Sequence, residues 1–152
     1  NDNTSATEEV LVAIGNLNTA MGTANLTDFE FVNTVYDKSA GFTMSVIARF
    51  NEAVDVTGTP QLSVTNGNQG TGTGRGPHVL SYASGTGSNE LTFTLAIAAA
   101  NAATNADDVM VIGTNAIALN SGTIKDTGTT TVSVFANAAG IGSAAGSVTV
   151  VA

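Results

Sequence analysis

The run from Gly70 to Gly76, with glycine at every second position, is the segment whose composition most resembles a reactive loop. Glycine loops bind phosphate when a strand precedes them, a helix follows them, and a Lys-Ser/Thr pair or an acid stands at fixed spacing. Here Pro77 and a strand-like segment follow instead. We therefore predict a long hairpin loop whose tip is a contact surface, with Gly72, Gly74 and Arg75 as candidate interaction residues.

His78 is the only histidine and directly follows this run. A Ser-His-Asp site needs a nucleophile on a sharply shaped turn, and no G-x-S-x-G motif occurs in the chain. We predict that His78 is a surface or hairpin residue with a structural role. No catalytic residue is assigned, and we expect a protein that is not an enzyme. Sugar cleavage is also disfavoured because no Trp platform accompanies the acids, although weak binding of cell-surface glycans stays open.

The acidic residues form small groups, namely Asp107-Asp108, Asp126, and Glu52 with Asp55. Calcium prefers several hard oxygen ligands, but no D-x-D-x-D-G run is present. Asp107 and Asp108 would also point to opposite faces of a strand. We predict solvated acids with no metal and no cofactor, and a structural Ca²⁺ ion is the alternative.

Composition limits the possible partners. The 152 residues carry a net charge of −8, from 12 acidic and 4 basic residues, and the basic ones form no cluster. Phosphate contacts need such clusters, so a nucleic-acid role is not expected. No apolar run is long enough to span a membrane. Hydrophobic residues make up 43% and charged residues 11%, which predicts a real core beneath a neutral surface that offers trypsin-like proteases few sites.

Residues 1–26 differ in composition from the rest and are predicted to be an N-terminal arm. Ser5 and Glu8 have capping-box spacing, which predicts a short helix. The alternation over Val10–Ile14 predicts a strand or an extended arm instead, and both interpretations remain open, with the strand slightly favoured. Either form has little of its own to pack against, so we expect it to dock elsewhere. The candidate interaction residues of the arm are Val10, Leu11, Val12 and Ile14.

From residue 28 onward the chain has the period-two pattern of short strands separated by turns. In residues 91–95, three apolar side chains alternate with two threonines, as in a strand with one buried face. A helical turn is expected at the alanines of 98–103. For 136–145 no regular element is predicted, and this tail could wander or fill a groove. The expected strands are 29–35, 42–50, 62–64, 79–82, 91–97, 109–112, 116–119, 131–135 and 148–151.

Four segments follow one another in a characteristic order: Phe50–Val54, Val56–Pro60, Gly87–Phe93 and Ser121–Asp126. Together they resemble the immunoglobulin-like domains of bacterial surface proteins and of tailed-phage virion proteins. The resemblance implies an all-β, immunoglobulin-like β-sandwich over residues 27–152, with the arm as an extension. The pattern departs after Asp126, where the D-x-A-G-N turn usual in those domains is absent.

The resemblance and the surface composition together predict a non-enzymatic structural or decoration protein of a tailed-phage virion. It would display its domain on the capsid or tail and attach through the arm to other virion proteins or to identical subunits. The alternative is an extracellular protein of a bacterial or archaeal cell surface, either an adhesin or a filament subunit that polymerises by donor-strand exchange.

Overall fold

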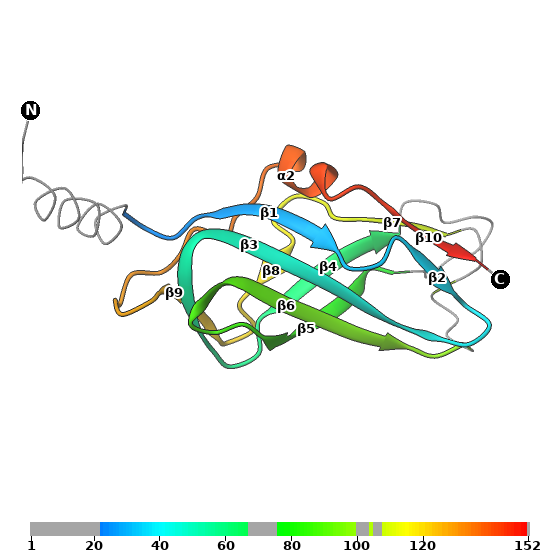
Figure 1. Cartoon of the computed structure of the whole chain (residues 1–152), viewed down its shortest axis with the longest axis horizontal. Coiled ribbons are helices and arrows are strands. Elements are labelled where there is room, and N and C mark those ends of the chain that lie inside the picture. The colour runs from blue at the N-terminus through cyan, green and yellow to red at the C-terminus, as the bar shows by residue number, and fades with distance from the viewer. Residues whose placement is uncertain (1–21, 67–75, 100–103, 105–107, 152) are drawn as a thin grey trace, which may run out of the picture.

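The computed structural model describes residues 22–66, 76–99, 104 and 108–151, and within them nearly all of the regular elements are β-strands (Figure 1). The all-β class expected from the sequence is confirmed. One short helix, α2, interrupts the strands near the C-terminal end. The elements are β1 (Leu26–Phe31), β2 (Val35–Asp37), β3 (Phe42–Thr57), β4 (Gln61–Asn66), β5 (His78–Ser84), β6 (Ser88–Ile97), β7 (Val109–Val111), β8 (Ile117–Ala118), β9 (Thr123–Asp126), α2 (Ala139–Ala144) and β10 (Val148–Val151).

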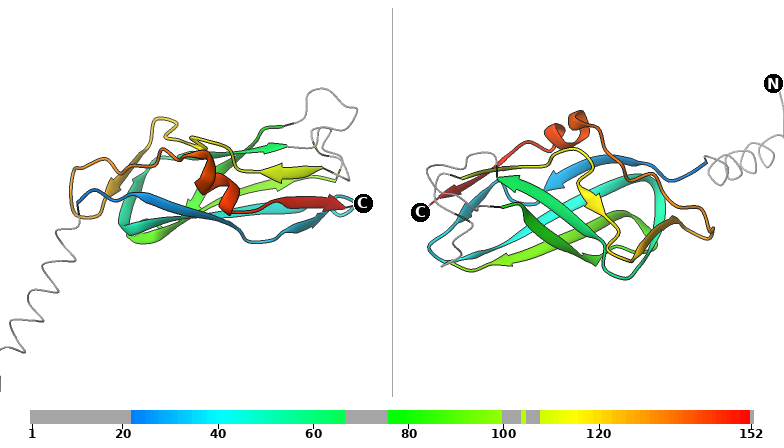
Figure 2. Two further views of the ribbon diagram at one scale, coloured as in Figure 1. Left: turned by 90° about the horizontal axis from the view of Figure 1, so that it is seen from above. Right: turned by 180° about the vertical axis from the view of Figure 1, so that it is seen from behind.

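The strands form one mixed sheet in the order β1-β3-β6-β5-β4-β7-β10-β2, with β8 beside β4 and β9 beside β3. Only β10 and β2 run parallel; the other named pairs are antiparallel. The sheet curls at β4, which pairs with β5 through residues 61–64 and with β7 through residues 65–66. Seen edge-on, one half of the sheet therefore lies over the other (Figure 2).

The core fills the space between the two halves of the sheet. Its side chains come from alternate positions of the strands, which all point inward. Along β3 the side chains of Met44, Val46, Ala48 and Phe50 all point inward and are buried. Their antiparallel partner β6 adds Leu91 and Phe93 in register, so that Val46 lies opposite Phe93. Each fully buried side chain of this size stabilises the fold by about 1.5–3 kcal/mol. The rest of the core comes from β1, β4, β5, β7, β9 and β10.

Two expected elements differ in the structure. The strand predicted at 131–135 forms only two isolated bridges, because Val132 pairs with Lys125 on one side and Val134 with Asn25 on the other. The predicted strand 29–35 is divided, since β1 ends at Phe31 and β2 begins at Val35. The helical turn expected at 98–103 lies mostly outside the described residues.

The small-residue tail, for which no regular element was predicted, contains α2, and glycine explains its fit. A Cβ at Gly142 would lie 2.3 Å from the Ile112 carbonyl oxygen, so the helix can approach this backbone only without a side chain there. Its position beside β1 covers the outer edge of that strand (Figure 1). The tail therefore packs against the domain through α2.

We predict that Gly142→Ala destabilises the protein by about 1–3 kcal/mol, because the added methyl group forces α2 away from Ile112. Gly140→Ala is the matched control in the same helix, since a Cβ at Gly140 meets nothing within 4 Å. It should be neutral or stabilise by up to about 1 kcal/mol. Urea unfolding measures both variants, and equal effects would show that α2 is not packed in this way.

Candidate functional site

The described residues hold a buried polar cluster at the pole of the domain where β4 ends and β5 and β7 begin. We call Asn66, His78, Thr104 and Asp108, together with Lys38, the pole cluster. Asn66, His78 and Asp108 each occupy the last inward position of an apolar series, after Val64, before Leu80 and before Met110 respectively. The sheet register brings these strand ends together, because Val64 pairs with His78 and Asn66 with Met110.

Specific contacts connect the members of the pole cluster. The Asn66 side-chain amide donates to the Asp108 carboxylate at 2.6 Å, and His78 Nε2 lies 3.2 Å from Thr104 Oγ1. The Lys38 ammonium group, which follows β2, donates to the backbone carbonyl of Thr104. The β4–β5 and β6–β7 connections and the end of β2 are thereby tied to one another.

Thr104, His78 and Asp108 are residue types that also occur in acyl-transfer sites, so their geometry matters. The Thr104 residue is 1% exposed and Asp108 is fully buried, and the Asp108 carboxylate accepts a hydrogen bond from the Asn66 amide. Burial lowers the pKa of His78, and the nearby Asp108 charge opposes this shift. Burial therefore favours a neutral imidazole, and its contact with Thr104 gives His78 a structural role.

Two expectations are corrected here. His78 was predicted to be a surface or hairpin residue; it begins β5 of the β4–β5 hairpin, but the surface alternative is wrong, because His78 is the first inward residue of β5 and is 4% exposed. Asp108 was predicted to be solvated but is buried before Met110 in the β7 alternation. The contributions of Asn66 and Thr104 were missed. For Asn66 a signal existed, namely a polar residue two positions after Val64 in an inward-facing series.

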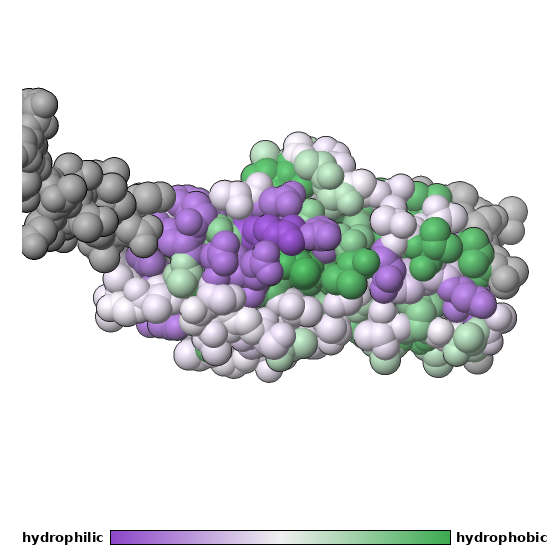
Figure 3. Space-filling view, in the orientation of Figure 1, coloured by the Kyte–Doolittle hydropathy of each residue, from purple (hydrophilic) through white to green (hydrophobic). Residues whose placement is uncertain are grey.

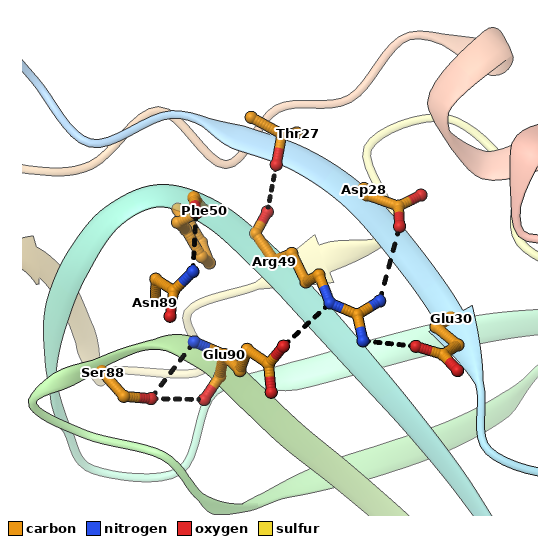
Figure 4. A network of polar contacts seen from close by, with 8 residues as sticks. All are labelled: Thr27, Asp28, Glu30, Arg49, Phe50, Ser88, Asn89 and Glu90. Atoms are coloured by element: carbon orange, nitrogen blue, oxygen red, sulfur yellow. Dashed lines mark hydrogen bonds and ion pairs between the residues drawn. The ribbon is translucent and has the colours of Figure 1, made fainter.

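A second polar network lies on the outer face of β1, β3 and β6 (Figure 4). Arg49 forms ion pairs with Asp28 at 3.5 Å, with Glu90 at 2.9 Å, and with Glu30. The hydrogen bond with Glu30, followed by that with Glu90, raises the pKa of Arg49 further above its usual range. This network fixes side chains across three neighbouring strands on an exposed, hydrophilic part of the surface (Figure 3), where single ion pairs contribute little stability.

Exposed apolar residues gather near the free edge of the sheet. Val32, Val35 and Val151 belong to the chain after β1, to β2 and to β10, and all three are exposed. Figure 3 shows apolar surface over β2 and beside the chain that leads to it. A second exposed pair, Val132 and Val134, lies at the opposite end, beside the start of β1.

The interaction residues predicted from the sequence, in both the arm and the glycine loop, lie outside the described residues. Their attachment points are described. The arm joins the domain at Gly22, before β1, whereas the glycine loop joins β4 to β5 at the pole cluster (Figure 1). The two predicted contact regions therefore attach at opposite poles of the domain.

Comparisons with protein-family models, with curated proteins and with solved structures find no match to this chain. Among the described residues, no three His, Asp or Glu side chains are grouped so that they could hold a metal ion. The same part of the chain contains no helix long and apolar enough to cross a membrane.

We predict that acidification destabilises the protein partly through His78. Folding favours its neutral form, whereas the histidine of the unfolded chain takes up a proton near pH 6.5. The stabilisation is complete above that pH and is lost as the pH falls below it, by roughly 1 kcal/mol at most at pH 5.5. Urea unfolding at pH 7.5 and 5.5 should show a smaller loss for His78→Gln than for the wild type. Equal losses would contradict the assigned role of His78.

Proposed function

We propose that this protein is a non-enzymatic structural subunit with an immunoglobulin-like β-sandwich, which decorates the capsid or tail of a tailed-phage virion. The observation that carries the fold assignment is the strand order. Two runs within the one sheet, β1-β3-β6-β5 and β4-β7-β10-β2, support this fold, because an immunoglobulin-like domain pairs its strands in two sheets of similar order. The first two strands are consecutive in the sequence but belong to different runs, since β1 pairs with β3 and β2 pairs in parallel with β10.

The buried polar groups of the domain support a structural function in preference to a catalytic one. The pole cluster combines a histidine, a hydroxyl group and a carboxylate, but all three are buried and occupied by contacts within the domain. A nucleophile needs access to a substrate and an adjacent base that is free to take its proton. The proposed activity is therefore assembly and display.

The surface composition supports exposure outside a cell. Only 11% of the residues are charged, and 4 of the 152 are Lys or Arg. The small number of Lys and Arg residues gives trypsin-like proteases few sites. A decoration subunit with this surface needs a separate attachment element, and the apolar segment Val10–Ile14 in the arm supplies the chemistry for one.

The second candidate function is that of a secreted bacterial or archaeal surface protein, an adhesin or a donor-strand filament subunit. The observation that favours it is the attachment of the arm at the pole opposite the free edge of β2 (Figure 1). A subunit with contact regions at its two ends is suited to forming chains.

We predict that this chain is present on gradient-purified phage particles from the culture that carries its gene. Mass spectrometry is the measurement, with a protease that cleaves beside acidic residues, because the chain has 12 of these and only 4 basic ones. Peptides in a constant ratio to the major capsid or tail protein are the expected result. Recovery of the chain from cells or culture medium but never from particles would contradict the virion proposal and favour the second candidate.

A further inference from the structure

The strand β2 is an open edge of the sheet. It is the last strand in the order, paired with β10 on one side, and no described strand pairs with its other side. The Thr34 carbonyl accepts from Thr149 and the Lys38 amide donates to Val151, so by alternation the peptide groups of Val35 and Asp37 face away from β10. Among the described residues no backbone group bonds to these peptide groups, which are of the kind that an added strand pairs with.

The opposite end of the sheet order is covered. The amide of Leu26, in β1, donates to the Val134 carbonyl, and the Val134 amide donates to Ala24. Farther along β1, α2 packs against the strand. Of the two terminal strands in the described sheet, β2 is thus the one that presents unpaired backbone.

The side chains around this edge are suited to an apolar strand. Val35, on the outward face, is 57% exposed and lies opposite Thr149 of β10, and the exposed Val151 lies opposite Asp37, two positions further along the same face. On the inward face, Tyr36 stacks on the partly buried Phe42, with ring centroids 4.4 Å apart. A strand added to β2 would place alternate side chains beside the valines and beside Phe42.

We propose that the free edge of β2 binds the segment Val10–Ile14 from the arm of a second copy of this chain, in a head-to-tail contact. This inference rests on the proposed assembly function and names the partner and the receiving surface. The segment has five apolar residues in a row, so both faces of the added strand can bury apolar side chains. It also supplies the backbone groups that pair with Val35 and Asp37.

Chain length decides between a second copy and the arm of the same copy. Residues 13–21 separate Val12 from Gly22, so Val12 can lie at most about 35 Å from Gly22. From Gly22 the chain runs along the domain through β1 to Tyr36, fourteen positions further and mostly extended, roughly 45 Å. At full extension Val12 reaches less far than the length of this path, and the arm attaches at the pole opposite the β2 edge, so a neighbour's edge is the one it can meet without folding back along its own domain.

Three full-length variants test the contact, each introducing one aspartate. Val12→Asp places a charge in the middle of the docking segment, and Val35→Asp places one at the receiving edge. Val132→Asp is the matched control, because Val132 is 54% exposed at the opposite pole. Sedimentation velocity over a concentration series should show association of the wild type and of Val132→Asp, and association weaker by at least tenfold for the other two. Circular dichroism confirms that each variant is folded.

Mixing the two defective variants gives the sharpest result. Val12→Asp retains an intact edge and Val35→Asp an intact arm, so one productive contact remains possible between them. We expect the equimolar mixture to form a dimer of about twice the 15.1 kDa chain mass, and no larger species, while each variant alone stays monomeric. An arm-to-arm contact could not be restored in this way.

Several outcomes would overturn the inference. They are a wild type that is monomeric at every concentration, association lost in Val132→Asp but kept in Val35→Asp, or a mixture that stays monomeric. If the chain is found on phage particles in any of these cases, the proposed function stands and the arm docks on a different virion protein. If the copies associate as expected but the chain is never found on particles, the contact stands and the virion assignment fails.

Discussion

The antiparallel ladder between β3 and β6 is the interaction on which the rest of the structure depends. It joins Phe42 with Ile97 at one end and continues to Arg49 with Glu90, and its inward residues include Met44, Val46, Phe93 and Leu91. Every other part of the first half of the sheet is added to one of these two strands, β1 and β9 to β3, and β5 to β6. The two strands are far apart in sequence, so the ladder closes a long loop and its entropic cost must be met by this shared apolar face.

The pole cluster and the open edge of β2 both depend on how the rest of the sheet continues from this ladder. The sheet curls through β5 and β4, which brings β7, β10 and β2 over the first half and places the ends of β4, β5 and β7 together. At those strand ends the apolar core stops and the inward positions are polar. Asn66, His78 and Asp108 occupy them, and the Asn66 amide donates a hydrogen bond to the Asp108 carboxylate. The same curl leaves β2 as the final strand, short and exposed on its outer side. The pole cluster and the open edge are thus consequences of one topology.

The sequence predicts most of the strands, because alternation is a local signal that β3 and β6 carry over many residues. It predicts less well where pairing is decided by distant segments. Val132 and Val134 alternate as in a strand, yet they bridge two different neighbours, and no local pattern reveals that. The helix α2 depends on a close approach of Gly142 to Ile112 and has little signal in an Ala/Gly tail. His78 was misplaced because polarity suggested exposure, whereas its position two residues before Leu80 in β5 sets its burial.

If the proposed contact forms, the edge of β2 is open in the single chain and covered in the assembly by a neighbouring copy. Amide hydrogen exchange at Val35 and Asp37, measured by NMR or mass spectrometry across a concentration series, distinguishes these two states. We expect fast exchange at both residues in dilute protein and protection that grows with concentration, while amides in the β3–β6 ladder stay protected throughout. Exchange at Val35 and Asp37 that does not change with concentration would contradict the proposed contact.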